Sequence, residues 1–246
     1  GNLGSPRLSR LFFDRRDASQ FFFTDPYDLT VLRPEDIIFT NTLSPFTNLS
    51  YYKTFDSRNG EERFKSYFAI NANKRFGVGF YIDYLYGRGL YASQSTAFFN
   101  GGLFASYRGD KYNMHFIFNN DNLKMAENGG IADDRYITNP LDMAEGKKEY
   151  KSYDIPTNLN KVWNHNTSYH VFMTQRYNLG FHKEKTDSVT KDSVRIIQEF
   201  VPVTSFIHTL QVDLNGRKYI SYDDEQNQKY FEHNYLGNDS IDKTRR

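Results

Sequence analysis

The sequence predicts an all-β fold: a transmembrane, antiparallel, up-and-down β-barrel, represented by about nine strands. Three observations predict it. Apolar and polar residues alternate along most of the chain, which is the periodicity of strands with two different faces. The connections between these strands are alternately short and long. Aromatic residues make up 17% of the chain and gather near the expected strand ends, where the interfacial girdles of barrels lie.

The composition excludes several classes of protein. The net charge is +1, from 31 basic and 30 acidic residues, which gives no reason to expect nucleic acid as a partner. The chain has no cysteine, so disulfides and thiolate metal sites are excluded. No apolar run of about 18 residues is present, so a transmembrane helix is not expected. Soluble β-proteins and membrane β-barrels remain, because barrel strands carry only a weak hydropathy signal.

Residues 1–46 differ from the rest of the chain. Their apolar clusters, among them "LFF" and "FFF", are broken by Pro26, Pro34 and Pro45. We therefore expect a lead-in segment, irregular or with short strands, that lies in the periplasm or in the lumen of the barrel. Its apolar runs need burial against another part of the molecule. Residues 47–246 would then form the N-terminal portion of the barrel.

From about residue 47 the two-residue period dominates. The segments 64–73 and 76–86 each place phenylalanine, isoleucine and other apolar side chains on one parity. Both have about ten residues, the length that a tilted strand needs to cross a bilayer. The next strands are expected at 95–107 and 111–120, joined by a tight turn at 108–110 because Gly-Asp favours turn geometry.

The second half of the chain alternates strands with loops. Residues 121–160 lose the periodicity, which predicts a long loop. Strand character returns at 162–174 and, after a short break, in "YNLGFHKEK". A second, charged loop is expected at about 183–199 and a strand at 201–214. The sequence "NGRK" predicts a hairpin turn that leads into a last strand at "YISY", followed by a polar tail.

The alternation of connection lengths favours a membrane barrel over a soluble sandwich. A barrel has short periplasmic turns and long extracellular loops, whereas a sandwich has no reason to place its short turns at one end. The apolar face would then meet lipid, and the polar face a lumen filled with water or side chains. Within hydrocarbon, a sheet pairs all of its backbone groups only when it closes into a barrel. About nine strands are therefore expected to be part of a barrel whose remaining strands lie outside this chain.

Parity along the strands divides the candidate site residues into two sets. The set expected to line the pore contains Lys65, Asn71, Tyr81, Asp83, Asn113, His115, His170, Gln211 and Asp213. The set expected to face lipid contains Phe76, Val78, Phe80, Ile82, Met114, Phe116, Phe118 and Val171. A pore with such mixed charges has weak ion preference and selects by size. Alternatively, the polar set hydrates an inner wall or forms a packed, salt-bridged core.

Catalytic and metal chemistry have little support. The acidic stretch 121–134 could offer oxygen ligands to Ca²⁺, but its spacing does not match an EF-hand loop. The six histidines form no HExxH or H-x₃-H pair, and no nucleophile stands with a base. Gly77 and Gly79 lie inside a strand rather than before a helix, which argues against a phosphate loop. We therefore expect no enzymatic activity, no metal and no cofactor.

Several stretches resemble the β-barrel porin family of the Bacteroidetes outer membrane. They are "FFFTDPYDL" (21–29), "SPFTNLSY" (44–51), "NKRFGVGFYIDYLYGRGLYASQS" (73–95), "NLKMAENGGIADDRYITNP" (122–140) and "RYNLGF" (176–181). The similarity runs through most of the chain, and "YGRGLYASQS" is among its more specific parts. The resemblance implies the N-terminal part of a barrel in the outer membrane of a Gram-negative bacterium, and diffusion of small solutes.

Three functions are consistent with these features. The first is a passive outer-membrane porin, whose partners are outer-membrane lipid and small solutes. The second is a structural or assembly subunit of an outer-membrane complex, with the barrel plugged by its own side chains or by residues 1–46 and docked beside other outer-membrane proteins. The third is a soluble glycan-binding β-sandwich, to which exposed aromatic residues would point.

Overall fold

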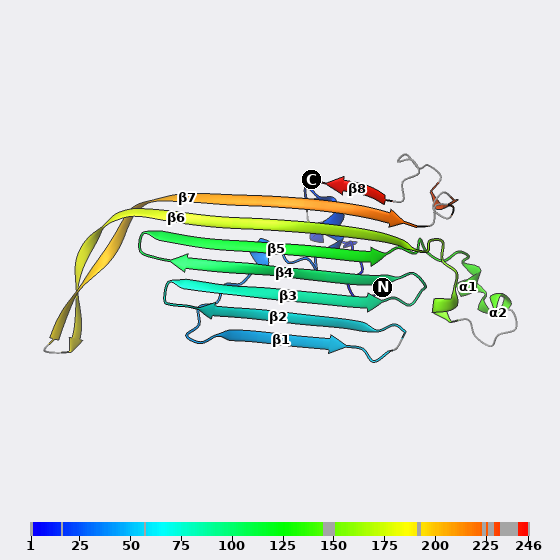
Figure 1. Cartoon of the computed structure of the whole chain (residues 1–246), viewed down its shortest axis with the longest axis horizontal. Coiled ribbons are helices and arrows are strands. Elements are labelled where there is room, and N and C mark those ends of the chain that lie inside the picture. The colour runs from blue at the N-terminus through cyan, green and yellow to red at the C-terminus, as the bar shows by residue number, and fades with distance from the viewer. Residues whose placement is uncertain are drawn as a thin grey trace.

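The described residues of the computed structural model form one antiparallel sheet of eight strands (Figure 1). The structure describes residues 2–15, 17–56, 58–144, 151–190, 193–222, 225, 229–231 and 241–245. The order of the strands in the sheet is their order in the sequence, which is the up-and-down connectivity that the sequence predicts. Within the described part of the chain the sheet is open, with β1 at one edge and β8 at the other.

The strands lengthen along the chain. They are β1 (Phe46–Lys53), β2 (Glu61–Asn71), β3 (Phe76–Arg88), β4 (Ser95–Arg108), β5 (Tyr112–Ala126), β6 (Val162–Thr190), β7 (Ser193–Ser221) and β8 (Ile241–Arg245). The helical elements are short: η1 (Phe12–Asp14), η2 (Phe22–Tyr27), η3 (Pro34–Asp36), α1 (Arg135–Thr138), α2 (Pro140–Met143) and η4 (Ser152–Asp154). Where the chain is described, none of its helices combines the length and the apolar content that crossing a bilayer requires.

The tight turns lie together at one end of the sheet. The connections 72–75 and 109–111 are at this end, whereas 54–60, 89–94 and 127–161 are at the opposite end, where the last of them carries α1 and α2 (Figure 1). The predicted alternation of short and long connections therefore describes these five connections correctly.

Three predictions in the second half of the chain are wrong. The strand β6 runs through the expected break after residue 174, and β7 runs through "NGRK" without a turn. Most of the loop expected at 183–199 is also strand. The reason is that β6 and β7 pair with each other along nearly their whole length, so that Gly216 lies opposite Thr167 instead of at a hairpin tip. Continuous pairing outweighs a local turn preference.

The strand count and one loop boundary also change. The described part of the chain has eight strands where nine were expected, because β6 and β7 each absorb two expected strands and β8 lies in the expected polar tail. The strand β5 continues to Ala126, so residues 121–126 are strand rather than loop.

The long strands continue beyond the rest of the sheet as a two-stranded ribbon. The pairing of β5 with β6 ends at Tyr112 and Tyr177, and the register of β6 and β7 shifts between Leu179 and Gly180. This bulge lies where the ribbon leaves the sheet at the tight-turn end (Figure 1). The longest strands therefore project at the end where only short turns were expected.

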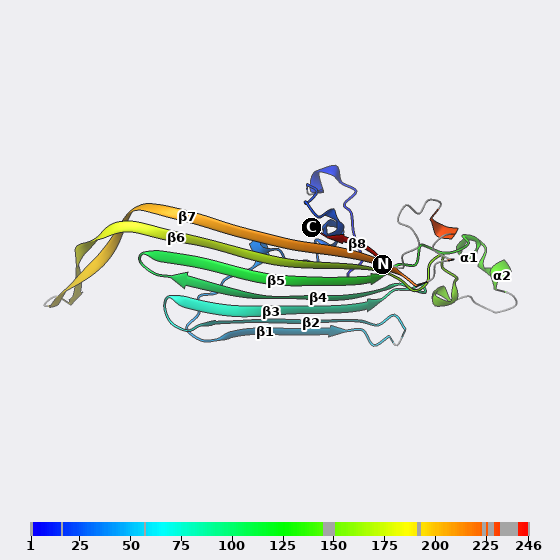
Figure 2. The ribbon, with the colours of Figure 1, turned by 45° about the horizontal axis from the view of Figure 1, so that its top comes forward.

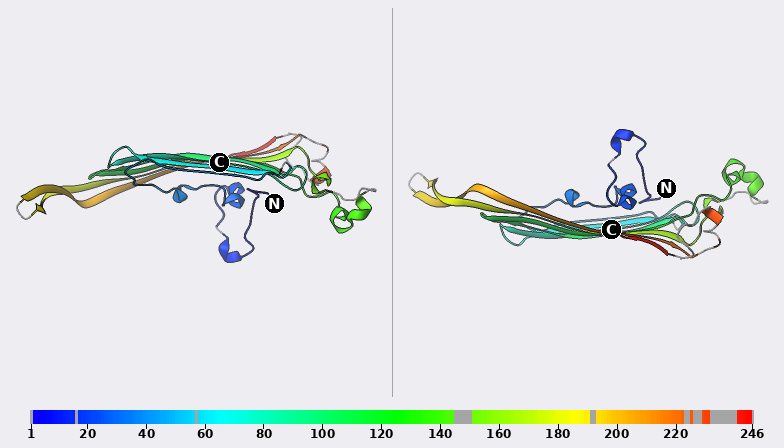
Figure 3. Two further views of the ribbon diagram at one scale, coloured as in Figure 1. Left: turned by 90° about the horizontal axis from the view of Figure 1, so that it is seen from below. Right: turned by 90° about the horizontal axis from the view of Figure 1, so that it is seen from above.

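The described residues between 2 and 45 are here named the N-terminal segment, and most of them lie against one face of the sheet. Figure 3 shows the segment on one side of the sheet only. Its residues 7–15 and 17–20 belong to a loop that stands away from the strands (Figure 2 and Figure 3). We name the covered face the inner face and the opposite one the outer face. This arrangement creates a core between an irregular segment and a sheet.

The core consists of two clusters on the inner face. Ile37 of the segment packs with Tyr81, Phe104 and Ile117, and Tyr27 packs with Leu85, Phe98 and Leu123; these are the buried members of the two clusters together with Ala69. Burial of each large apolar side chain contributes about 1.5–3 kcal/mol to stability. The two clusters therefore provide the main attraction between the segment and the strands.

The apolar runs of the segment are buried unequally. Phe21 of "FFF" is buried, but Leu11, Phe12 and Phe13 of "LFF" are largely exposed in the part of the loop that is away from the sheet. The expectation that both runs are buried is therefore wrong for "LFF" in this structure. Arg7 closes the base of the loop through two hydrogen bonds of 2.8 Å to the carboxylate of Asp28.

Candidate functional site

The strand register places the two predicted residue sets on opposite faces. On the outer face one row of paired residues crosses six strands, and its members are Phe68, Phe80, Leu103, Phe118, Val171 and Val212. One position away lies the corresponding inner row of Tyr67, Tyr81, Gly102, Asn119, His170 and Asp213. Parity and register also place the other predicted pore-lining residues on the inner face and the other predicted lipid-facing residues on the outer face.

A line of asparagine side chains attaches the N-terminal segment to the inner face. Each donates a hydrogen bond from its Nδ2 to a backbone carbonyl of the segment. The pairs are Asn71 to Thr42 (2.8 Å), Asn100 to Thr30 (2.8 Å), Asn119 to Leu32 (2.9 Å) and Asn166 to Phe23 (3.1 Å). The described residues of the segment belong to no strand of the sheet, so these amides supply hydrogen bonds to partly buried carbonyl groups that no strand pairs.

The sequence prediction included only Asn71 of these four asparagines. The available signal was parity, because Asn100, Asn119 and Asn166 follow the same alternation as the predicted inner-face residues. What parity does not reveal is their partner, since the segment that accepts their hydrogen bonds is distant in sequence.

The start of the segment is held at the loop end of the sheet. Asn2 donates from Nδ2 to the carbonyl of Gly87 (3.2 Å) and to Oγ1 of Thr96 (3.1 Å). The amide of Leu3 donates to Oε1 of Glu61 (2.7 Å), and the hydroxyl of Thr96 donates to the carbonyl of Leu3 (2.6 Å). The segment is therefore anchored at both sides of its projecting loop.

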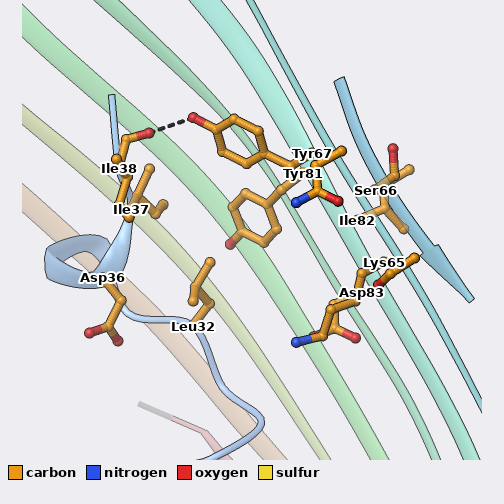
Figure 4. Close-up of a pocket in the computed structure, with 12 residues that line it drawn as sticks. Leu32, Asp36, Ile37, Ile38, Lys65, Ser66, Tyr67, Tyr81, Ile82 and Asp83 are labelled. Carbon is orange, nitrogen blue, oxygen red and sulfur yellow. Dashed lines mark hydrogen bonds and ion pairs between the residues drawn. The ribbon is translucent and has the colours of Figure 1, made fainter. Parts of the chain in front are cut away.

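A hollow of about 270 Å³ separates the segment from β1–β3 (Figure 4). Tyr67 and Tyr81 form one wall, and Tyr67 donates a hydrogen bond of 2.5 Å to the carbonyl of Ile38. Lys65 and Asp83 lie at the sheet side and Asp36 on the segment. Asp83 accepts from Arg63 at 2.6 Å and lies 3.7 Å from Nζ of Lys65. The hollow thus combines aromatic walls with charges of both signs.

A second hollow of about 530 Å³ lies between the segment and strands β6 and β7. His170, Gln211 and Asp213, all predicted to line a pore, are among its wall residues, and Arg33 and Glu35 face them from the segment. His170 Nδ1 lies 2.6 Å from Asp213 Oδ1. Hollows therefore flank the segment on both sides. The one beside β1–β3 is mainly apolar, and the one beside β6 and β7 is the more polar.

Two of the predicted pore-lining residues, Tyr81 and His115, pack against the segment. Tyr81 is buried beneath the segment, and His115 makes an edge contact with the ring of Phe39, with centroids 5.0 Å apart. Both side chains are therefore packed against the segment, although part of the Tyr81 ring borders the first hollow. They show that the inner face is partly a packed core, as the alternative interpretation of the polar set allows.

The acidic stretch 121–134 does not converge on one point. Asp121 is buried within β5, whereas Asp133 is bound by Arg135 of α1 at 2.6 Å. Hydrogen bonds from Arg135 hold the pKa of Asp133 below its usual value. No group of three or more histidine and carboxylate side chains suited to a metal ion occurs among the described residues.

Two ionisable groups lie at the junction of the segment with the long connection. Burial raises the pKa of Glu127, which directly follows β5. Burial, with Glu127 nearby, raises the pKa of Tyr27 to about 12. The Tyr27 hydroxyl is therefore protonated at neutral pH, and it lies 3.7 Å from Sδ of Met125.

Comparison with known proteins identifies one family. A family model described as "Putative porin" matches residues 1–246, the whole chain. The chain has no significant match among curated proteins or among solved structures.

Proposed function

The chain belongs to the family described as "Putative porin", and from this premise we propose that its sheet forms part of the wall of an outer-membrane β-barrel through which small polar solutes diffuse. The observation that supports this function most directly is the contrast between the two faces. The outer row from Phe68 to Val212 is apolar at every strand, while the inner row carries tyrosine, asparagine, histidine and aspartate.

An apolar outer face of this extent is what lipid contact requires. Several outer-face side chains are exposed, among them Val78, Phe99, Leu103, Phe206 and Leu214. In water such a surface would promote aggregation, but in a bilayer it makes favourable contact with lipid chains, as the outside of a barrel wall does. Closure of the wall requires that the free edges of β1 and of β7–β8 be paired by other strands, because unpaired edges are not stable in lipid.

The inner face fits weakly selective transport of small solutes. The hollows beside the segment carry Lys65 and Arg33 as well as Asp83 and Asp213. Walls with both signs of charge discriminate little between ions, and the segment would limit the size of a solute by narrowing the lumen. Nucleophilic or metal catalysis forms no part of this proposal.

The transport function is tested by solute flux. Full-length protein reconstituted into liposomes is expected to let small sugars and amino acids enter, with a rate that falls steeply as solute size increases. The measurement is osmotic swelling, with protein-free liposomes as the control. Rates equal to those of protein-free liposomes for all solutes would refute a passive pore.

A plugged structural subunit is the second candidate, because the segment covers the centre of the inner face. Replacing Asn100, Asn119 and Asn166 by alanine removes three attachments of the segment. If the segment narrows an open pore, this variant should pass larger solutes than the native protein. A variant with alanine at Asn120 and Asn122, which lie on the outer face, serves as the control. If neither the native protein nor the segment variant passes any solute, the structural role is favoured.

Location is tested separately from flux. We expect the protein in the outer-membrane fraction and soluble only with detergent. A soluble glycan-binding sandwich is disfavoured, since the described strands form one sheet rather than two packed sheets. Recovery of the full-length protein as a monomer in detergent-free buffer would restore that alternative.

A further inference from the structure

A group of buried oxygen atoms without hydrogen-bond partners lies beneath the N-terminal segment. The described residues contain six buried side-chain oxygens without a partner. Four of them lie at neighbouring inner-face positions of β3, β4 and β5: Tyr81 Oη, Asn100 Oδ1, Asn119 Oδ1 and Asp121 Oδ1. The other two belong to Asn120 and Asn166. All four residues are at most 5% exposed. A buried acceptor left unpaired costs about 1–3 kcal/mol, so a group of them requires an explanation.

The register brings these four residues together. Asn100 and Asp121 lie directly opposite each other on β4 and β5, where paired side chains begin about 5 Å apart. Asn119 is on the same face of β5, and its Nδ2 lies 3.5 Å from Asp121 Oδ2.

Tyr81 reaches the group across Gly102. Gly102 lies between Tyr81 on β3 and Asn119 on β5 in the pairing. A Cβ added to Gly102 would be 2.6 Å from Cε1 and 2.9 Å from Cζ of the Tyr81 ring. The ring therefore lies over Gly102, and its hydroxyl points toward β5, where Asn119 and Asp121 lie.

The segment determines which end of each asparagine amide faces the group. Asn100 and Asn119 donate from Nδ2 to the carbonyls of Thr30 and Leu32. A flipped amide would place its oxygen against a carbonyl oxygen, which is repulsive. The Oδ1 atoms are thus held as acceptors away from those carbonyls. Asn119 also directs its Nδ2 to Asp121 Oδ2 at 3.5 Å, so its contribution to the group is one weak donor as well as one unpaired oxygen.

The charge of Asp121 is also not balanced by a strong cationic partner. Within the described part of the chain its ion-pair partner is His170, whose Nε2 lies 3.7 Å from Asp121 Oδ2. The other ring nitrogen of His170 is 2.6 Å from Asp213, so this imidazole is shared between two carboxylates. A buried carboxylate is costly unless positive charge or donors compensate it.

We propose that Asp121, Asn100, Asn119 and Tyr81 form a binding site for a monovalent hard cation such as Na⁺. Carboxylate, amide and hydroxyl oxygens are the ligands that hard cations prefer. The single carboxylate balances one positive charge, whereas Ca²⁺ sites usually gather several acidic ligands. The bound cation holds the amides that bind Thr30 and Leu32, so it stabilises the segment on the sheet. This site is independent of whether the lumen conducts solutes.

The test uses full-length protein in detergent micelles and measures the thermal unfolding midpoint. At constant ionic strength, replacing choline chloride by NaCl should raise the midpoint progressively with Na⁺ concentration, because a ligand of the native state stabilises it. Asp121→Asn and Asn100→Ser should each lose most of this Na⁺-dependent shift.

A matched asparagine provides the control. Asn71 also donates to a segment carbonyl at 2.8 Å, but it is not one of the unpaired oxygens. Asn71→Ser should therefore lower the midpoint and keep the Na⁺-dependent shift.

Three outcomes would overturn the site: an identical midpoint in NaCl and choline chloride, an unchanged Na⁺ shift in Asp121→Asn, or a larger shift with CaCl₂ at equal ionic strength. The first outcome would mean that water or a proton satisfies the oxygens. If Asp121→Asn fails to fold, two other measurements decide the question. One is the Na⁺-dependent shift of Asn100→Ser, and the other is the ²³Na line width with the native protein, which should broaden on binding.

Discussion

Phe98 and Phe99 are neighbours in β4 and have opposite surroundings. Phe98 points to the inner face, is 0% exposed and makes an edge contact with the ring of Tyr27, with centroids 5.6 Å apart. Phe99 points to the outer face and is 42% exposed. Alternation along a strand therefore reports that two faces differ, but it does not say which face is better packed. Here the face with more polar residues is the buried one, because a segment distant in sequence covers it.

The largest expected effect separates these two neighbours. Phe98→Ala removes a fully buried ring from between Tyr27 and Leu85, so the free energy of unfolding should fall by about 3–5 kcal/mol. Phe99→Ala should cost well under half of that in detergent. Denaturant unfolding of both full-length variants is the measurement. Equal costs at the two positions would mean that the segment does not cover the inner face in solution.

The next effect tests what the outer face contacts. Leu103 lies at the centre of the outer row, between Phe80 and Phe118. In a bilayer, Leu103→Arg should cost roughly 2–4 kcal/mol, as charged residues do near the midplane of a barrel. Unfolding from lipid vesicles measures the cost, and Leu103→Met is the control of similar volume, for which a loss below about 1.5 kcal/mol is expected. A stable Leu103→Arg protein in vesicles would contradict lipid contact at this face.

Two adjacent glycines give a smaller contrast between the faces. A Cβ on inner-face Gly102 would meet Tyr81 at 2.6 Å and the carbonyl of Phe118 at 2.7 Å, so Gly102→Ala should cost about 1–3 kcal/mol. A Cβ on outer-face Gly101 would approach the Phe99 ring only to 3.3 Å, and that ring is 42% exposed, so it has room to shift. Gly101→Ala should therefore be close to neutral. The unfolding midpoints of the two variants decide this comparison.

The smallest effect compares two acids of the same connection as pH changes. The native pKa of Glu127 is raised by burial, so the native state retains this proton longer than the unfolded state. Glu127 therefore lowers stability as pH rises from its ordinary pKa to its native one. Glu127→Gln should match the native protein in stability near pH 4 and exceed it near pH 8.

Asp133, which is only partly exposed, should behave in the opposite sense. Its pKa is lowered by Arg135, so its contribution is present above its ordinary pKa and is lost as pH falls through its native pKa. The readout for both acids is the unfolding midpoint at several pH values. A stabilising effect of Glu127→Gln that was equal at pH 4 and pH 8 would contradict the burial of Glu127.

Much of the first half of the sheet follows from the sequence alone. The strands from β2 to β5, the tight turn before Tyr112 and the separation of Phe80 from Tyr81 onto opposite faces all agree with the pattern of residues. These features depend on neighbouring residues, because the two-residue period of a strand is a local property of the backbone. The pattern therefore predicts which side chains share a face.

The candidate site depends much less on local pattern. Asn166 acts by donating to Phe23, and Asn100 by donating to Thr30. The turn expected at "NGRK" is absent because β6 provides a continuous partner for β7. Each of these outcomes is a contact or pairing that the pattern of neighbouring residues does not specify.

The sequence by itself determined the all-β class, the alternation of faces and the family, since periodicity, composition and motifs are all properties of consecutive residues. Only the tertiary structure decided which face is covered, how far β6 and β7 extend, and that Asp121 lies among unpaired oxygens beneath Thr30 and Leu32. The physical reason is that burial and hydrogen-bond satisfaction are set by the partner that a side chain meets, and here the partner comes from a distant part of the chain.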